Sequence, residues 1–334
     1  MRQTIRTAII GCGDIAGRND EQKKTNGIFT HAGAYRAFPE IEIAAAFDVN
    51  RARLDEFCDY WKVAKGVSSL EELLRDRYDI ISVCTGDDSH HEVMEKILEA
   101  GSAGYIWAEK PLANTAARAK KVISMAREKN VGLWLSSQRR WEPCHLQIRQ
   151  KLSEGMIGNI IHVNGYYVKG ITHIGCTLIN TMRFLCGDID WAMAFPPFDA
   201  GSYGADPSMR GIMGFKSGAT ASITGCDADE YVYSIFELDI MGTNGRIRIE
   251  ENGDVIYVYE AREYDNYQGF KELKLIQKIE TEMKWSMKYG LGMLMKDMSE
   301  GKRSAFFAEE GLADMLIVEA LKHSAASGGT RVGA

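Results

Sequence analysis

Short apolar runs alternate with amphipathic segments over the first part of the chain. The apolar runs cover residues 7–11, 43–48, 79–85, 105–110 and 131–137. Strands that are buried on both faces of a parallel sheet read as such almost continuous runs, whereas the helices between them carry an apolar stripe. The alternation therefore predicts a doubly wound α/β sheet, which we place at residues 1–130.

Capping residues mark the helices of this region. Two helices are expected to begin with a capping box, in which a serine precedes a glutamate by three positions: Ser69 with Glu72, and Ser89 with Glu92. Gly101 is suited to end the second of these helices. A third helix is expected within 114–130, with Asn114 or Thr115 as its cap.

The second part of the chain has a different pattern. Alternating apolar and polar runs are joined by turn residues at 216–218, 243–245 and 252–253. Asn-Gly between alternating runs indicates a β-hairpin, so this part predicts an α+β domain with a large, open, mostly antiparallel sheet. We place this domain at 131–334, with a closing helix at about 308–325 that packs back on the first domain.

The alternating segment 233–260 predicts a sheet with two distinct faces. One face is expected to pack on helices of the same domain. The other face carries Tyr257, Tyr259, Phe236 or Leu238, depending on the register of the strands.

Composition and charge exclude several classes of protein. Of the 334 residues, 45% are hydrophobic and 26% are charged, as in ordinary globular domains. The 40 basic and 46 acidic residues give a formal net charge of −6, which disfavours nucleic acid or an anionic membrane as partner. No stretch is apolar enough to span a bilayer, and the N-terminus lacks the pattern of a signal peptide.

The cysteines indicate a reducing compartment. Seven cysteines are scattered along the chain without a CxxC pair. An odd, scattered set is not typical of a disulfide framework or a zinc site. We therefore expect a cytoplasmic protein without a metal site.

A glycine-rich turn follows the first predicted strand. Gly11, Gly13 and Ala16 match the dinucleotide-binding pattern G-x-G-x-x-G/A, and Cys12, Asp14 and Ile15 lie between them. The first glycine allows the tight turn, the second lets a pyrophosphate approach the backbone, and the small third residue allows close packing of helix and strand. A glycine turn without a ligand is the alternative.

Asp48 ends the second predicted strand and favours NAD as cofactor, with NADP less favoured. An acidic residue there can bind the ribose hydroxyls and repel a 2′-phosphate. Asp48 lies 32 positions after Ala16 rather than the usual 20 or so, and we assign the excess to a polar insertion at 18–30 before the helix resumes near His31. Arg51 could instead admit a 2′-phosphate.

Two polar residues end later strands of the same predicted sheet. Thr85 follows the run 79–85, and Lys110 stands between Glu109 and Pro111. In an open parallel sheet, ligands bind beyond the carboxyl ends of the strands. Thr85 and Lys110 are therefore candidate ligand-binding residues, although Glu-Lys pairs are commonly found on solvated surfaces.

Five motifs in succession resemble one family. The segments GCGDIAG, CTGDDSHHEVMEKILEAG, AEKPLA, SQRRWEP and EGMIGNI are similar, in order and spacing, to those of the glucose–fructose oxidoreductase/inositol dehydrogenase/MocA (Gfo/Idh/MocA) family. The resemblance covers residues 5 to about 190, and the last helix resembles that family's closing helix. It implies a cytoplasmic NAD- or NADP-dependent oxidoreductase of sugars, cyclitols and related hydroxy compounds, with a Rossmann domain followed by an α/β domain.

The resemblance assigns roles to individual residues. Lys110 matches the family's active-site lysine. Residues expected near the nicotinamide half of the cofactor are Thr85, His90, Glu109 and Gln138. Gly86 stands where the family usually has proline. The family also implies a homodimer or homotetramer assembled through the sheet of the second domain.

His173 is the second candidate catalytic residue. Many family members carry Asp-x-Gly-x-His here, whereas this chain has His173 at the aspartate position and Thr177 at the histidine position. Asn180 replaces a following aspartate. The resemblance places His173 in the substrate cleft with one histidine rather than two; from the residues alone, a histidine packed in a core is the alternative.

Three functions are consistent with this sequence. The first is an NAD(P)-dependent oxidoreductase that transfers a hydride between nicotinamide and a secondary alcohol or ketone of a sugar, nucleotide-sugar or cyclitol. The second is a glycosidase that oxidises and re-reduces its substrate with bound NAD, and the third is a non-catalytic dinucleotide- or sugar-sensing regulator. In the first, Lys110 holds the substrate oxygen and His173 moves the proton, and the further candidate substrate contacts are Arg140, Tyr167, Lys169 and Thr177.

Overall fold

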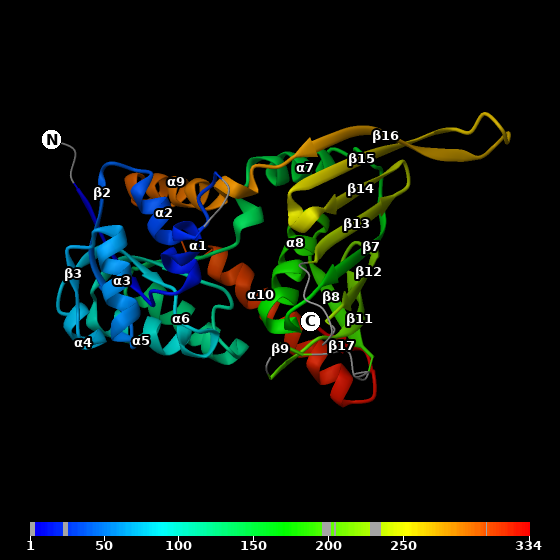
Figure 1. The fold of residues 1–334 in the computed structure, drawn as a ribbon. Helices are drawn as coiled ribbons and strands as arrows, with labels where there is room; N and C mark the ends of the chain where they lie inside the picture. Colours follow the sequence, from blue (N-terminus) through cyan, green and yellow to red (C-terminus); the bar gives the residue numbers. More distant parts are fainter. Residues whose placement is uncertain (1–3, 23–25, 196–201, 204, 228–234, 305) are drawn as a thin grey trace. The chain divides into compact units, whose positions relative to one another are not determined.

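The computed structural model describes residues 4–22, 26–195, 202–203, 205–227, 235–304 and 306–334 (Figure 1). The chain divides into two compact units. The first comprises the residues up to Trp141 together with Lys284–Leu312, and the second comprises Glu142–Met283 and Ala313–Ala334. The chain thus returns to the first unit after completing most of the second.

The first unit is a parallel α/β sheet in the strand order β3-β2-β1-β4-β5-β6. Its strands are β1 (Ile5–Ile10), β2 (Ile41–Phe47), β3 (Lys65–Gly66), β4 (Tyr78–Val83), β5 (Ala103–Ala108) and β6 (Gly132–Leu135). The strand interiors are buried, in agreement with their continuous apolar runs. The order reverses between β1 and β4, where open α/β sheets bind ligands. The predicted doubly wound sheet is confirmed.

Helices connect the strands of this unit. They are α1 (Asn19–Glu21), α2 (His31–Arg36), α3 (Arg51–Trp61), α4 (Leu70–Leu73), α5 (His90–Ala100), α6 (Ala116–Glu128) and α9 (Ser286–Ser299). Helix α10 (Phe306–Ala326) begins in the residues of the first unit and ends in those of the second.

The structure confirms some of the expected helix caps and corrects others. Thr115 caps α6 and Gly101 ends α5 in the left-handed conformation, both as predicted. Ser69 accepts from the Glu72 N–H, but the Glu72 carboxylate reaches back to Ser68 rather than to the cap. The predicted capping box at Ser89 and Glu92 is wrong, because the Ser89 hydroxyl donates to the Gly86 carbonyl instead.

The insertion after the glycine-rich turn interrupts the first helix, as predicted. A π-helical turn (Asp14–Arg18) and α1 precede it, and α2 begins at His31. The buried Asp20 carboxylate accepts from the Phe29 N–H, the Thr30 N–H and the Thr30 hydroxyl. The insertion is therefore fixed at the point where α2 starts; its residues 23–25 lie outside the described residues.

The second unit is built on a nine-stranded, mostly antiparallel sheet in the order β16-β15-β14-β13-β7-β12-β11-β8-β17. The strands are β7 (Ile160–Tyr167), β8 (Ile189–Ala194), β11 (Arg210–Phe215), β12 (Thr220–Gly225), β13 (Phe236–Gly242), β14 (Gly245–Glu250), β15 (Val255–Glu263), β16 (Lys271–Glu280) and β17 (Val332–Gly333). Only β7 and β12 pair in parallel among these strands. Two short strands, β9 (Ser202–Tyr203) and β10 (Asp206–Pro207), pair separately. The predicted open sheet is confirmed.

Helices cover the inner face of this sheet. Side chains of α7 (Pro143–Ser153), α8 (Cys176–Cys186) and the second part of α10 form one core with the inward-facing strand residues. Phe236 and Leu238 lie in this core, whereas Tyr257 and Tyr259 are half-buried and alternate with the buried Ile256 and Val258. The tyrosines therefore occupy the outer face; residues 233 and 234 of the expected alternating segment lie outside the described residues.

Strands β15 and β16 form a hairpin that projects beyond the rest of the sheet (Figure 1). β16 is an edge strand, and most of its side chains are exposed. The exposed apolar side chains of the hairpin are Tyr267, Phe270, Leu273, Leu275 and Ile276. Within the described residues, no helix is both long and apolar enough to cross a membrane.

Candidate functional site

The glycine-rich turn follows β1 at the carboxyl edge of the first sheet. Gly11 has φ +87°, and a Cβ there would lie 2.6 Å from the Cys84 carbonyl oxygen, so only glycine fits. A Cβ at Gly13 would meet nothing within 4 Å. Ala16 is fully buried. The turn therefore packs tightly against β4 at its first glycine and leaves open space at its second.

The other residues of the turn differ in exposure. Asp14 is exposed and Ile15 is half-buried. Burial, and then the nearby Asp48 carboxylate, raise the pKa of the Cys12 thiol. This thiol stays protonated near neutral pH, so Cys12 offers the site no reactive sulfur.

Asp48 is joined to the glycine-rich turn. One carboxylate oxygen accepts from the Cys12 N–H at 2.8 Å, and the other accepts from the Asn50 N–H at 2.7 Å. The basic residue beside Asp48 is Arg53, at 3.6 Å, and not Arg51, which pairs with Asp55 on the surface. The Arg51 side chain faces Asp55 in the structure, and its role toward a 2′-phosphate stays a prediction.

Thr85 and His90 occupy the end of β4. The Thr85 hydroxyl oxygen is buried without a hydrogen-bond partner in the structure. The two ring nitrogens of His90 lie 2.9 Å from the Thr85 carbonyl oxygen and 2.7 Å from that of Pro111. His90 therefore ties the end of β4 to the turn after β5, and both its nitrogens are engaged.

Glu109 and Lys110 follow β5. The Glu109 carboxylate is buried and lies 3.0 Å from Nε2 of His31. Burial acts to raise the Glu109 pKa, but the hydrogen bond and electrostatic interaction with His31, together with the charge of Lys110, outweigh it and lower that pKa. Glu109 is thus an ionised group turned toward His31, a residue for which sequence reasoning proposed no role. Lys110 itself is half-buried.

Gln138 and Arg140 follow β6 and contact the returning part of the chain. The Gln138 amide accepts from the Ser286 hydroxyl at 3.0 Å and donates to the Met287 sulfur at 3.4 Å. The buried Arg140 guanidinium pairs with Glu310 at 2.6 Å. These contacts lie within the first unit and join the residues after β6 to α9 and to the start of α10.

In the second unit, His173 lies in a π-helical turn, Gly170–Gly175, between β7 and α8. The α-helix that follows, α8, begins only at Cys176, after His173. The turn begins with a left-handed pair, Lys169 at φ +64° and Gly170 at φ +75°. A Cβ at Gly170 would lie 2.2 Å from an Asp206 carboxylate oxygen.

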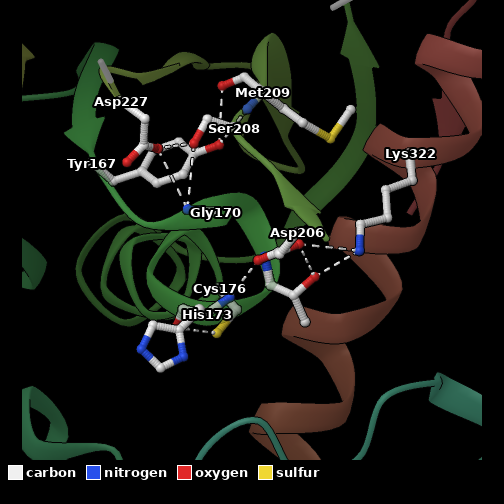
Figure 2. Close-up of polar contacts among 10 residues, drawn as sticks. Tyr167, Gly170, His173, Cys176, Asp206, Ser208, Met209, Asp227 and Lys322 are labelled. Carbon is white, nitrogen blue, oxygen red and sulfur yellow. Dashed lines mark hydrogen bonds and ion pairs between the residues drawn. The ribbon is translucent and has the colours of Figure 1, made fainter. Parts of the chain in front are cut away.

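Two carboxylates hold this turn, as Figure 2 shows. Asp206 accepts from the N–H groups of Thr172 and His173 at 2.7 and 2.9 Å, and Asp227 accepts from the Lys169 N–H at 2.7 Å. Such bonds satisfy N–H groups that the start of a helix leaves unpaired.

Lys322 of α10 completes the contacts around Asp206. Its ammonium lies 3.5 Å from the Asp206 carboxylate and donates to the Thr172 hydroxyl at 2.6 Å. The His173 imidazole points away from Asp206 (Figure 2). The backbone of His173 is therefore fixed while its ring is directed elsewhere. No sequence signal linked Asp206 and Asp227 to His173, because they lie 33 and 54 positions away.

The remaining candidates in this unit have different surroundings. Tyr167 is fully buried, and its hydroxyl bonds the Met209 carbonyl and N–H. Burial raises its pKa. This packing leaves the Tyr167 hydroxyl inaccessible, so we do not retain it as a substrate contact. Lys169 is exposed, Thr177 is half-buried in the first turn of α8, and Asn180 is buried and donates to Asp314.

These features define a class of protein: an α/β protein with a Rossmann-type sheet, a glycine-rich turn and an acidic residue on the adjacent strand. Residues 5–137 match the family model GFO_IDH_MocA, described as "Oxidoreductase family, NAD-binding Rossmann fold". The match agrees with the resemblance to the Gfo/Idh/MocA family over residues 5–137, which lie in the first unit.

Curated relatives match over parts of their length. The chain is 33% identical to the uncharacterized oxidoreductase YhhX of Escherichia coli (strain K12) over 101 residues, which are 30% of this chain and 29% of the relative. It is 27% identical to 1,5-anhydro-D-fructose reductase of Ensifer adhaerens over 208 residues, 55% of this chain and 61% of the relative. The chain thus covers less than two thirds of either relative.

The fold is shared over almost the whole chain with a solved structure. Levoglucosan dehydrogenase in complex with NADH and L-sorbose aligns with a TM-score of 0.82 at 18% identity, covering 99% of this chain and 98% of that one. The two-unit architecture is therefore that of a known fold.

Proposed function

We propose that this protein is an NAD-dependent oxidoreductase that transfers a hydride between nicotinamide and a secondary alcohol or ketone of a carbohydrate-like compound. The observation that carries the proposal is the Asp48 carboxylate bonded to the Cys12 N–H of the glycine-rich turn. This bond joins the two elements that would bind the ribose and the pyrophosphate of a dinucleotide. The names of the relatives, a reductase and a dehydrogenase of sugars, support the substrate class.

The residues present fit NAD. The open space at Gly13 suits a pyrophosphate close to the backbone, and the unpartnered Thr85 hydroxyl is a group that a bound ligand would satisfy. The turn residues proposed to hold the pyrophosphate are Gly11, Cys12, Gly13, Asp14, Ile15 and Ala16. Asp48 would bind the adenosine ribose and disfavour NADP, while Arg53 beside it reduces that preference.

Around the nicotinamide, Thr85 is the best supported contact. His90, Glu109 and Gln138 would shape this region through the contacts that their side chains already make. When bound, the nicotinamide supplies the acceptor or donor of the hydride. The protein supplies the groups that handle the oxygen and the proton.

Lys110 and His173 are the proposed catalytic residues. The Lys110 ammonium would hold the substrate oxygen and stabilise the negative charge that develops on it. The His173 imidazole would take the hydroxyl proton during oxidation and return it during reduction. The Thr177 hydroxyl can position the substrate but is a poor base near neutral pH. Lys169 remains a candidate substrate contact, whereas Arg140 would act through its pair with Glu310.

The test is turnover with purified protein, NAD or NADP, and a panel of sugars, nucleotide-sugars and cyclitols. We expect NADH to accumulate with at least one compound and Lys110→Ala to abolish it. Cleavage of a glycoside without net NADH would instead indicate a redox-assisted glycosidase. Binding of NAD and sugar without any turnover would indicate a regulator, and either result contradicts the proposal.

We further propose a homodimer or homotetramer assembled through the second sheet, in the cytoplasm. The exposed apolar side chains of the β15–β16 hairpin support an assembly, because contiguous apolar surface and an open sheet edge are typical of contact surfaces. Light scattering over a wide concentration range tests it, and a monomer throughout would contradict it. The free thiols of all seven cysteines support the cytoplasmic location.

A further inference from the structure

We propose that His31 is a positioning residue for Lys110, acting through the buried carboxylate of Glu109. The inference rests on the proposed function for its consequence in catalysis, but its structural part is testable without turnover. His31 lies at the start of α2, directly after the insertion, 78 positions before Glu109.

The pair is enclosed in the first unit. His31 is fully buried and Glu109 nearly so. The imidazole packs on the Trp107 ring with centroids 4.1 Å apart, and its Nε2 lies 3.0 Å from a Glu109 carboxylate oxygen. Because few charges are tolerated in such surroundings without a partner, an ionised Glu109 depends on His31.

A chain of hydroxyl groups orients the imidazole from the other side. Nδ1 of His31 lies 2.9 Å from the Ser82 hydroxyl oxygen, which lies 2.6 Å from the Tyr35 hydroxyl oxygen. Burial raises the Tyr35 pKa, so this phenol stays protonated. With Tyr35 donating to Ser82 and Ser82 donating to Nδ1, the proton of a neutral imidazole is on Nε2 and is donated to Glu109.

Glu109 transmits this arrangement to Lys110. The two residues are consecutive after β5, and the charge of Lys110 is among the causes that lower the Glu109 pKa. A carboxylate that His31 holds in place keeps a negative charge beside Lys110. Loss of His31 leaves Glu109 without its partner, so the buried carboxyl takes up a proton and the counter-charge of Lys110 disappears.

The polar insertion at 18–30 helps to position His31. Asp20 bonds the N–H and hydroxyl of Thr30, and the Thr30 hydroxyl caps α2. The cap fixes the first residue of the helix, which is His31. The polar segment before α2 therefore sets the position of the imidazole that faces Glu109.

The experiment compares four variants by the rate at which Lys110 is acetylated, measured by mass spectrometry, since only an unprotonated amine reacts. His31→Leu and Glu109→Gln should each raise that rate by about tenfold at neutral pH, because each removes the negative charge beside the Lys110 amine. His31→Gln keeps an amide donor toward Glu109 and should stay near the wild-type rate. His145→Gln is the matched control, because His145 is an equally buried histidine paired with Glu142 in the other unit.

Kinetics give the second readout. His31→Leu should lower kcat by about tenfold or more with little change in NADH affinity, and His31→Gln should restore most of it. The double variant His31→Leu/Glu109→Gln should be no worse than the worse single variant, because both remove the same charge.

The outcomes separate this inference from the proposed function. Faster acetylation in His31→Leu and Glu109→Gln, with no turnover in any protein, would support the effect of the His31–Glu109 pair on Lys110. It would contradict the proposed oxidoreductase function. Unchanged acetylation in both variants, with stability lowered as in His145→Gln, would make the pair a purely structural one and overturn the inference. If His31→Leu fails to fold, Glu109→Gln decides alone.

Discussion

The backbone N–H of Cys12 donates to the Asp48 carboxylate at 2.8 Å, so the glycine-rich turn after β1 and the end of β2 form one connected surface. A carboxylate in this position repels the 2′-phosphate of NADP while accepting from ribose hydroxyls. The same carboxylate also holds the turn, so it serves both structure and specificity.

Replacing Asp48 should therefore reduce the preference of the protein for NAD over NADP. Asp48→Asn keeps an acceptor for the Cys12 N–H but removes the negative charge, and we expect the ratio of NAD to NADP affinity to fall about tenfold or more. Fluorescence titration with NADH and NADPH measures it. Asp55→Asn, an exposed carboxylate on the same helix as Arg53, is the control. Equal binding of NADPH and NADH by the unmodified protein would contradict the role of Asp48.

His173 should matter for chemistry much more than for cofactor binding. General acid–base groups typically contribute about a hundred- to ten-thousand-fold, so His173→Ala should lower kcat on that scale and leave NADH affinity nearly unchanged. Thr177→Ala should cost much less, because it removes a hydroxyl and no proton acceptor. Steady-state kinetics rank the variants. A silent His173→Ala, or a Thr177→Ala of equal severity, would reject His173 as the proton carrier.

The contribution of Asp206 to the stability of the His173 turn should be measurable by itself. Asp206→Asn removes the charge that accepts from the Thr172 and His173 N–H groups, and charge-assisted bonds of this kind are worth about 1.5–3 kcal/mol. We expect a loss of stability of that order in urea unfolding and a lower kcat. Asp190→Asn, an exposed carboxylate facing Arg331, should change neither. Full stability in Asp206→Asn would argue that the turn is held by other contacts.

Glu142 should give the protein a defined acid sensitivity. Burial opposes its ionisation, but bonds from His145 and from the His145 and Glu282 N–H groups lower its pKa to about 2. A folded-state pKa below the unfolded one adds stability that is complete above the unfolded pKa and is lost as the pH falls through the folded one. The stability difference between wild type and Glu142→Gln should thus be constant near neutrality and shrink from about pH 4.5 downward. A constant difference down to pH 3 in thermal unfolding would contradict this.

The sequence was sufficient for the fold because its strand and turn signals agreed with one another. Continuous apolar runs predicted the parallel strands, and turn residues such as Asn244-Gly245 predicted the hairpin between β13 and β14. The tight turn predicted at Gly11 is also present, since its positive φ and its closeness to Cys84 leave no room for a side chain.

The site was predicted less completely, because its supporting contacts join distant positions. His31 stands next to Glu109 only after the sheet brings β5 against the start of α2, and Asp206 reaches the His173 turn across 33 positions. The sequence also did not show which side chains are buried. Tyr167 was a candidate substrate contact, but it packs in the core. The capping box at Ser89 failed because a carbonyl nearby, that of Gly86, competes for its hydroxyl.

The central claim is that the protein transfers a hydride, and the most direct test is transfer of deuterium from [4-²H]NADH to a panel of keto sugars and keto-cyclitols. The two diastereomers of the labelled cofactor are used in parallel, and products are analysed by mass spectrometry. The account predicts a product one mass unit heavier, from one diastereomer only, with at least one compound, and a loss of this product in Lys110→Ala. Tight binding of NADH with no deuterium in any product, from either diastereomer, would contradict it.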